Sequence, residues 1–367
     1  MITIVFRKKS VIFLTFILLV VCMTAGLYGC EKQKVSEQSD GNENGISGYT
    51  KTDFVMDTVL SETIYGKTNL TDEVKNQLSV LEKEKLSWRE KNSETAQIND
   101  SGSRGNPYVM DEDFSMWVNT SLELAEASEG AFDPTIGNLT RLWNIEGENP
   151  TVPAQDEINR VMEEIGYSNI KNDEETHSIS MEDGCTLDLG AVGKGIGCDV
   201  IKEYFEKEPA VKGAVISIGG SILVYGDKGN GEDWSVAIRD PEKELDSYMG
   251  VLHLSETACV STSGDYEKYF MQDGKKYHHI LDPTTGYPAE SDLTSVTVVC
   301  RQGEKTDGLL SDGLSTACFV LGKEKGMQLL EQYGAGGIFI DKENQVYVTG
   351  NLEDQFEIIN EAYTLVK

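Results

Sequence analysis

Residues 277–289 read YHHILDPTTGYPA and bring together two adjacent histidines, an acid and a turn fixed by proline and glycine. A strand-like run, SVTVV at 295–299, follows this stretch. His279 lies beside the turn and close to Asp282, which suits it to take or hold a proton near neutral pH. A buried structural role is the alternative for either histidine. The stretch therefore predicts a turn before a strand, with His279 as its candidate functional side chain.

The stretch SDGLSTA at 311–317 predicts a helix with two different faces. Asp312 and Thr316 are one helical turn apart, so their side chains lie on the same face. A buried helix would thus direct a carboxylate and a hydroxyl towards one point. Such oxygen donors suit a hard cation such as Mg²⁺. Apolar side chains at helical spacing form the opposite face, namely Leu310, Leu314, Ala317, Cys318 and Leu321.

The chain has 367 residues, a net charge of −30 and a sequence pI near 4.4. This length can bury a large core, in one large domain or in two intertwined ones. The excess of acid argues against nucleic acid as a partner, and any anionic ligand needs a local basic or metal-bearing site. The cysteines at 185, 198, 259, 300 and 318 show no CxxC spacing, which favours buried thiols over disulfides or a zinc site.

The N-terminus has the pattern of an export signal. Basic residues at 7–9 precede an almost wholly apolar run at 10–26, and a small residue precedes Cys30. This pattern resembles a bacterial lipoprotein signal, which predicts a signal peptide at 1–29 and lipid attachment to Cys30. Polar residues 30–48 then form a tether, and one folded domain spans 49–367. An uncleaved transmembrane anchor is the alternative, and both place the domain on the extracytoplasmic side of the cell membrane.

Hydrophobic periodicity predicts helices at 71–86, 111–129, 153–165 and 323–333. Alternating runs predict a strand at 54–65 and a hairpin formed by 178–181 and 186–189. Helices mixed with mainly hairpin-linked strands indicate an α+β fold. Further strands are expected at 214–218, 222–225, 234–238, 250–254, 337–340 and 345–348, and within 267–277 on both sides of a turn at Asp273 and Gly274.

Three glycine-containing motifs have both a structural and a ligand-binding interpretation. The run DLGAVGKG at 188–195 enters a helix, where backbone N–H groups and Lys194 would attract an anion. It lacks the Walker pattern, and an ordinary strand-to-helix turn is the alternative. In GAFDP at 130–134, Asp133 either closes a turn or binds a ligand, and Phe132 either stacks on a planar ring or packs in the core. The glycine pair at 219–220 indicates a bulge or close approach of a ligand to the backbone.

These pieces, in this order, resemble the ApbE family of flavin transferases. The resemblance runs from about Phe54 to the end of the chain and implies an ApbE-like, T-fold-like architecture, with mainly antiparallel sheets and flanking helices. The motifs that carry it are VMDT at 55–58, SE at 93–94, IN at 98–99, GAFDP at 130–134, DLGAVGKG at 188–195, SIGG at 217–220, STSGDY at 261–266, HILDPTTGYP at 279–288 and DGLST at 312–316.

The resemblance also implies an activity and a set of site residues. The family splits FAD, transfers FMN through its phosphate to a Thr or Ser hydroxyl of an acceptor protein, and releases AMP. A metal ion, Mg²⁺, would be held by the Ala191 backbone carbonyl, Asp312 and Thr316. The implied FAD contacts are Met56, Trp88, Ala131, Phe132, Asp133, Asp188, Lys194 and Ile280.

This chemistry agrees with the charge of the chain. The doubly anionic pyrophosphate of FAD must bind to a very acidic protein, so Mg²⁺ would neutralise the phosphates and the charge that builds on the leaving AMP. Lys194 and the glycine amides would add fixed donors. A hydroxyl nucleophile must lose its proton, and we expect His279 as the base, with Asp282 orienting it.

Two other functions use similar residues. The first is a pyrophosphatase that splits FAD into FMN and AMP with water as the nucleophile. The second is a flavin-binding lipoprotein without catalysis, which would need neither a metal ion nor a base. By resemblance, the acceptors of a transferase would be exported flavoprotein subunits of respiratory membrane complexes.

Overall fold

The computed structural model describes residues 46–102, 106–243 and 247–366. Internal contacts divide the chain after Gln38, so every described residue belongs to the unit that spans 39–367. The predicted signal peptide at 1–29, Cys30 and nearly all of the tether lie outside the described residues. Within the described ranges, no helix has the length and apolar content needed to cross a membrane. The first strand begins at Ser47, slightly before the predicted domain start.

A nine-stranded sheet forms the centre of the fold, and its neighbouring strands are antiparallel except at the last pair. Three smaller sheets accompany it. The first has the order β16 (Phe356–Ile358), β9 (Tyr248–Leu254) and β8 (Trp234–Arg239), and the second has the order β3 (Tyr108–Val109), β5 (Ser178–Met181) and β4 (Ile170–Asp173). The third is the pair β11 (Tyr269–Gln272) and β12 (Lys275–His278). The order in the central sheet is β1 (Ser47–Val55), β2 (Thr58–Gly66), β6 (Val211–Ile218), β7 (Ser221–Gly226), β10 (Ala258–Gly264), β13 (Leu293–Cys300), β14 (Gly336–Asp341), β15 (Gln345–Val348) and β17 (Thr364–Val366).

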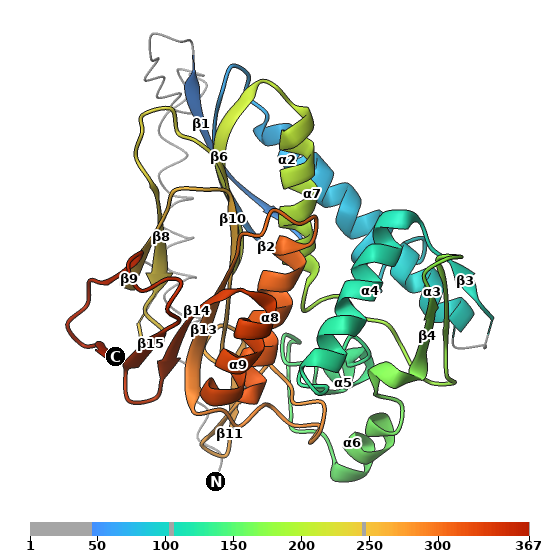
Figure 1. Ribbon diagram of the computed structural model, residues 1–367. Helices are drawn as coiled ribbons and strands as arrows, with labels where there is room; N and C mark the ends of the chain where they lie inside the picture. The colour runs from blue at the N-terminus through green and yellow to red at the C-terminus, as the bar shows by residue number, and fades with distance from the viewer. Residues whose placement is uncertain (1–45, 103–105, 244–246, 367) are drawn as a thin grey trace, which may run out of the picture. The chain divides into compact units, whose positions relative to one another are not determined.

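Helices cover one face of this sheet, and β8 and β9 lie against the other (Figure 1). The helices are α2 (Thr71–Val80), which continues as the π-helical turn η2 (Leu81–Leu86), α3 (Glu94–Gly102), α4 (Glu112–Ala127), α5 (Gly137–Trp143), α6 (Gln155–Met162), the short η3 (Tyr167–Asn169), α7 (Gly193–Lys207), α8 (Asp307–Leu321) and α9 (Lys323–Tyr333). The predicted helices at 71–86, 111–129, 153–165 and 323–333 are therefore confirmed in position.

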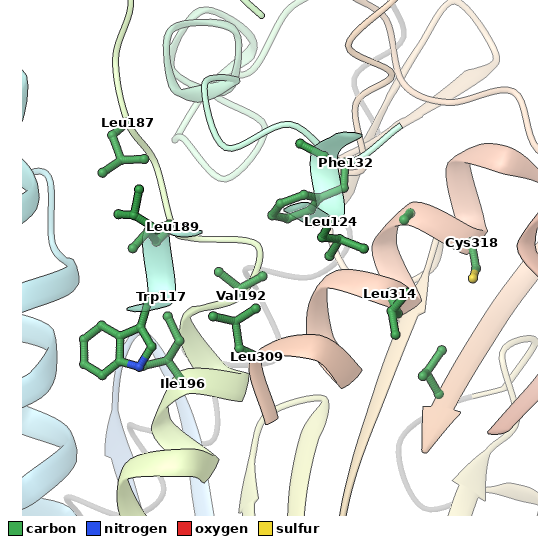
Figure 2. Packing of buried hydrophobic residues seen from close by; sticks show 14 of the residues in the cluster. Trp117, Leu124, Phe132, Leu187, Leu189, Val192, Ile196, Leu309, Leu314 and Cys318 are labelled. Carbon is green, nitrogen blue, oxygen red and sulfur yellow. The ribbon is translucent and has the colours of Figure 1, made fainter. Parts of the chain in front are cut away.

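The largest core cluster joins α4 and α8 to the loop before α7. Figure 2 shows Leu124 beside Phe132, and Leu314 on the facing helix, with Val192 between the loop and these helices. All of these side chains are almost fully buried. The apolar stripe predicted for α8 therefore packs into the core, which leaves the other face of the helix for polar contacts.

The prediction of one strand at 54–65 is wrong, because the chain reverses in its middle. Met56 and Asp57 have φ values of 53° and 54°, and Val55 pairs with Thr58, so a two-residue turn joins β1 to β2. Such turns favour Asn, Asp or Gly at both positions. Methionine at the first position is not typical of a turn, so the sequence pattern did not predict one.

The predicted hairpin of 178–181 with 186–189 is also wrong. The strand β5 pairs with the preceding β4, and Asp173 lies opposite Ser178. Residues 186–189 are outside any strand, and the Asp188 N–H donates to the Pro134 carbonyl at 2.7 Å. The glycine pair at 219–220 is the turn between β6 and β7 rather than a bulge, since Ile218 pairs with Ser221. The described cysteines are free and buried, as predicted.

Candidate active site

Helices α7 and α8 touch through their backbones at Gly195 and Gly308. A Cβ atom on Gly195 would lie 2.1 Å from the Gly308 carbonyl oxygen, which no side chain tolerates. Asp199 on α7 caps α8, because its carboxylate accepts from the N–H groups of Gly308 at 2.7 Å and Leu309 at 2.8 Å. These contacts fix the start of α8 against the first turn of α7.

Asp312 reaches this first turn from α8. The Gly195 N–H donates to Asp312 Oδ2 at 2.9 Å, and Lys194 Nζ lies 3.6 Å from the same oxygen. In a continuous helix that N–H would bond to the carbonyl of Ala191 instead. No described residue donates a hydrogen bond to the Ala191 carbonyl. The charge of Asp312 raises the pKa of Lys194 above its ordinary value, so the lysine stays charged.

The Thr316 hydroxyl lies one turn beyond Asp312, as the helical spacing predicts. Its Oγ1 is 3.4 Å from the Asp312 carbonyl oxygen and 3.2 Å from the Ser263 hydroxyl on β10. A further hydroxyl pair joins Ser261 to Ser311 at 2.8 Å. These hydroxyl contacts hold α8 on β10, so the helix face that carries Asp312 and Thr316 is polar.

The oxygen donors at the α7–α8 contact fit the predicted divalent ion. The Ala191 carbonyl, the Asp312 carboxylate and the Thr316 hydroxyl are the hard ligands that Mg²⁺ prefers. Asp312 is only 3% exposed, and a buried carboxylate needs a compensating positive charge. In the described ranges, no group of three or more His, Cys, Asp or Glu side chains could hold a metal ion. A site here would therefore be completed by backbone, hydroxyl or ligand oxygens.

His279 is half-buried at the end of β12, and its environment keeps the ring neutral. Its backbone N–H donates to the Lys268 carbonyl at 3.0 Å, and its Nδ1 is buried without a hydrogen-bond partner in the described ranges. Burial, followed by the charges of Lys268 and Lys194, lowers the pKa of His279 to about 3. An uncharged ring is the form that can accept a proton.

The neighbours of His279 have structural roles. The Asp282 carboxylate accepts from the Thr284 N–H at 2.8 Å and from the Thr284 and Thr285 hydroxyls, so it closes its own turn. These contacts do not include His279, and the orienting role of Asp282 stays a prediction. His278 is buried, its Nε2 lies 3.1 Å from the Ala289 carbonyl oxygen, and its ring meets Phe319 edge-on.

The GAFDP motif is part of the core. Phe132 is 2% exposed and packs in the largest hydrophobic cluster, which makes it a core residue rather than a free stacking surface. The Asp133 carboxylate accepts from the Thr135 N–H at 2.8 Å, the Thr135 hydroxyl at 2.6 Å and the Tyr167 N–H at 2.9 Å. Burial nonetheless raises the pKa of Asp133. Ala131 is half-exposed, unlike Phe132 and Asp133, which are buried.

The remaining predicted flavin contacts lie in different segments. Met56 occupies the turn between β1 and β2, and its N–H donates to Glu82 Oε2 at 3.1 Å. Trp88 is half-buried in the loop after η2. Asp188 precedes α7, and burial raises its pKa while the Gly190 N–H and the Arg141 charge oppose that rise. Ile280 is buried in the same cluster as Phe132.

Comparison with known proteins agrees with this arrangement. The family model described as "ApbE family" matches residues 56–339, which include all the site residues described above. The chain belongs to the ApbE family. The predicted α+β architecture with mainly antiparallel sheets is therefore confirmed as an ApbE fold.

Several relatives of this ApbE chain carry the same name, FAD:protein FMN transferase. The protein of Treponema pallidum is 29% identical over 365 residues, which cover 94% of this chain and 96% of the relative. That of Klebsiella pneumoniae is 30% identical over 276 residues, or 75% of this chain and 83% of the relative. That of Escherichia coli K12 is 28% identical over 338 residues, or 90% and 94% of the two chains.

Two solved structures of the ApbE family resemble this chain to a similar degree. The ApbE protein of Thermotoga maritima has a TM-score of 0.74 and 28% identity, and the match covers 84% of this chain and 99% of that one. The apo form of the flavinyl transferase ApbE of Pseudomonas stutzeri has a TM-score of 0.71 and 28% identity, with 84% and 97% covered.

Sequence reasoning missed the residues that position this ApbE site. Asp199 is an ordinary acid in the sequence, and its role as a cap depends on a helix that begins far along the chain. Arg141, on a helix that was not predicted, places its guanidinium 4.4 Å from the centre of the Trp88 ring. Ser263 belongs to the STSGDY motif at 261–266, but no pattern in the sequence predicted its hydroxyl contact with Thr316 on α8.

Proposed function

We propose that this chain is an Mg²⁺-dependent enzyme that transfers FMN from FAD to a Thr or Ser hydroxyl of an acceptor protein and releases AMP. The observation that carries the proposal is the arrangement of Ala191, Lys194, Asp312 and Thr316 around the α7–α8 contact. Family membership and relatives named FAD:protein FMN transferase support it. The chain would thus act on a phosphoanhydride with a hydroxyl nucleophile.

The proposed step exchanges one phosphorus–oxygen bond for another. The acceptor hydroxyl oxygen bonds to the phosphorus of the FMN half, and the bond from that phosphorus to the bridging oxygen breaks, so AMP leaves with the bridging oxygen. His279 takes the hydroxyl proton at Nε2, because its Nδ1 is buried. Lys194 donates to the phosphates and stabilises the charge on the leaving group. Mg²⁺, held by Ala191, Asp312 and Thr316, would supply further neutralisation of the phosphates.

The enzyme would work at the outer side of the cell membrane. We base this on the apolar leader and Cys30, which favour a lipid-anchored protein, and we expect exported flavoprotein subunits of respiratory complexes as acceptors. Mass spectrometry of the N-terminal peptide should show a lipid on Cys30 and the loss of residues 1–29. A protein that keeps residues 1–29 and carries no lipid on Cys30 would instead support an uncleaved transmembrane anchor.

An assay with the full-length protein in detergent separates the possible functions. The protein is incubated with FAD, Mg²⁺ and an exported flavoprotein subunit, and the acceptor mass and the free nucleotides are measured. The proposal predicts an FMN adduct on the acceptor and an equal amount of AMP. AMP and free FMN formed without an acceptor would show a pyrophosphatase, and intact FAD after long incubation would show a binding protein.

A further inference from the structure

Trp88 is in contact with two guanidinium groups that come from different parts of the chain. The groups of Arg89 and Arg141 each lie 4.4 Å from the centre of the Trp88 ring. The Arg89 side chain is 66% exposed and also lies 3.7 Å from Asp57, whereas Arg141 projects from α5 and is half-buried. An exposed cation on a ring contributes about 0.5–1 kcal/mol, so the contact with Arg89 needs no further explanation. The contact with Arg141 does need one, because the Nε atom of this half-buried side chain is buried.

Arg141 has an incomplete set of hydrogen bonds. Its Nη1 donates to Asn138 Oδ1 at 2.7 Å, but its Nε is buried and has no hydrogen-bond partner among the described residues. Burial lowers the pKa of this guanidinium, and the charge of Asp188 opposes that effect. Leaving a buried donor without an acceptor costs about 1–3 kcal/mol, and more when the group is charged. The Nε–H group, close to an aromatic ring, is thus a donor for which the described part of the chain supplies no acceptor.

Two further polar atoms converge on the same helix face. A Cβ atom on Gly137 would lie 3.2 Å from Asp188 Oδ2 and 3.3 Å from Thr186 Oγ1. Gly137 is one helical turn before Arg141, so both positions lie on one face of α5. Thr186 Oγ1 is buried without a hydrogen-bond partner among the described residues. Asp188 Oδ1 accepts from the Gly190 N–H at 2.8 Å, and within the described ranges no hydrogen bond occupies Oδ2.

We infer that Arg141, Thr186 and Asp188 form a site beside Trp88 that recognises the dione edge of the flavin ring. The inference rests on the proposed function and names the part of FAD that these residues would bind. Arg141 and Thr186 each offer a donor, and the Asp188 carboxylate offers an acceptor. The isoalloxazine edge offers the complement, because its N3–H lies between the O2 and O4 carbonyl oxygens. The amino edge of adenine has one ring acceptor beside its amine, so it would leave one of the two donors unpaired.

The residues act in recognition and not in the transfer step. Arg141 would be a specificity-determining residue, because its Nε–H gains an acceptor when the ring carbonyl arrives. Trp88 would provide a flat aromatic surface next to the bound dione edge of the flavin ring. Because Arg141 already contacts the Trp88 ring, the site is formed before the ligand binds.

The test measures binding of FMN and of AMP separately to the full-length protein in detergent, by calorimetry. FMN carries the dione edge without adenine, and AMP carries adenine without the dione. Arg141→Gln should weaken FMN binding about 10- to 100-fold, as expected for loss of a hydrogen bond from a charged group. Thr186→Val, which keeps the shape of the side chain, should weaken it about fivefold. Binding of AMP should change less than about twofold in both variants.

Arg89→Gln is the matched control, because it removes the other guanidinium on the same ring. It should weaken FMN binding by no more than about fivefold, the value of an exposed cation–π contact. Arg141→Lys keeps a charge but lacks the planar group, and should restore only part of the affinity. Circular dichroism verifies folding, and Thr186→Val provides the test if Arg141→Gln fails to fold.

Three results would overturn the inference: unchanged FMN binding in Arg141→Gln and Thr186→Val, an equal loss in Arg89→Gln, or a loss confined to AMP. Failure of the unmodified protein to bind FMN at all would contradict the proposed function as well. Normal binding to the unmodified protein with unaffected variants would contradict the recognition site alone.

Discussion

Burial determines the acid–base behaviour of His279. With its pKa lowered to about 3, the ring is neutral at every pH at which the enzyme would work. We expect His279→Ala to reduce the transfer rate by about 10²- to 10⁴-fold, the usual contribution of a general base. The affinity for FAD should change little, because the step lost is proton removal. Single-turnover kinetics and FAD binding, measured on the same preparation, separate the two effects.

The pH profile gives an independent check on the same residue. Because the pKa of His279 is lowered, its titration should not appear near pH 6.5, the ordinary value for histidine. His253→Ala is the control: this ring lies 3.3 Å from the Ser235 hydroxyl, outside the site, and its loss should leave transfer unchanged. A large loss of FAD affinity with normal turnover in His279→Ala would make the residue a binding group.

Glu62 should make stability depend on pH. It is 1% exposed, and neither carboxylate oxygen has a hydrogen-bond partner among the described residues. Burial raises its pKa from 4.5 to about 8, so the folded protein holds a proton that the unfolded chain releases. The stabilisation is complete below pH 4.5 and is lost as the pH rises through 8. From pH 6 to pH 8, the free energy of unfolding should fall by about 2 kcal/mol.

Denaturant titrations of the unmodified protein and of Glu62→Gln at these two pH values test this prediction. The glutamine variant keeps the shape and cannot ionise, so its free energy of unfolding should lose this pH dependence. The same slope in both proteins would show that Glu62 is not the titrating group.

At the scale of elements, the close contact of α7 with α8 positions the site. Gly195→Ala would place a Cβ atom 2.1 Å from the Gly308 carbonyl, so the helices must separate and Asp312 must move away from the Gly195 N–H. We expect transfer to fall at least about tenfold, although alanine favours a helix by about 1 kcal/mol. Gly193→Ala is the matched control on the same helix, because its Cβ atom would lie 3.5 Å from Leu86, an ordinary contact.

Activity and thermal unfolding of the two glycine variants are measured together. Gly193→Ala should remain active with equal or higher stability, and Gly195→Ala should lose both. Equal behaviour of the two variants would mean that the helix contact does not position the site.

Local patterns predicted the elements well where the signal lies within one segment. The polar face of α8 followed from the spacing of Asp312 and Thr316, because helical periodicity is a property of neighbouring residues. The turn at Met56 was missed, because a methionine with positive φ has no turn signature. The partner of β5 was also wrong, since several short strands could pair and only tertiary packing selects β4.

The site itself was predicted less completely. Its ligand-type residues could be named from motifs, but the motifs do not show which atoms the fold has already used. Asp282 and Asp133 have carboxylates that close turns, and Phe132 is in the core. The cap that Asp199 provides and the stacking of Arg141 on Trp88 join distant segments, and no local pattern encodes such pairs.

At the scale of the whole molecule, the net charge of −30 opposes the binding of a dinucleotide. Screening by salt weakens this repulsion at the surface, but a bound phosphate at a partly buried site needs local positive charge. Lys194 is the cation nearest to Asp312 among the described residues, and one lysine does not balance both a carboxylate and a pyrophosphate. A divalent ion at the α7–α8 contact would therefore supply the positive charge that the binding of FAD requires.

The most direct test is the Mg²⁺ dependence of FMN transfer in the unmodified protein and in Asp312→Ala, read as the mass of the intact acceptor. The unmodified protein should add FMN to the acceptor with Mg²⁺ and lose this activity with a chelator. Asp312→Ala should form no adduct at any Mg²⁺ concentration while it keeps its fold by circular dichroism. Equal adduct formation by Asp312→Ala, or full transfer in the presence of the chelator, would contradict the central claim.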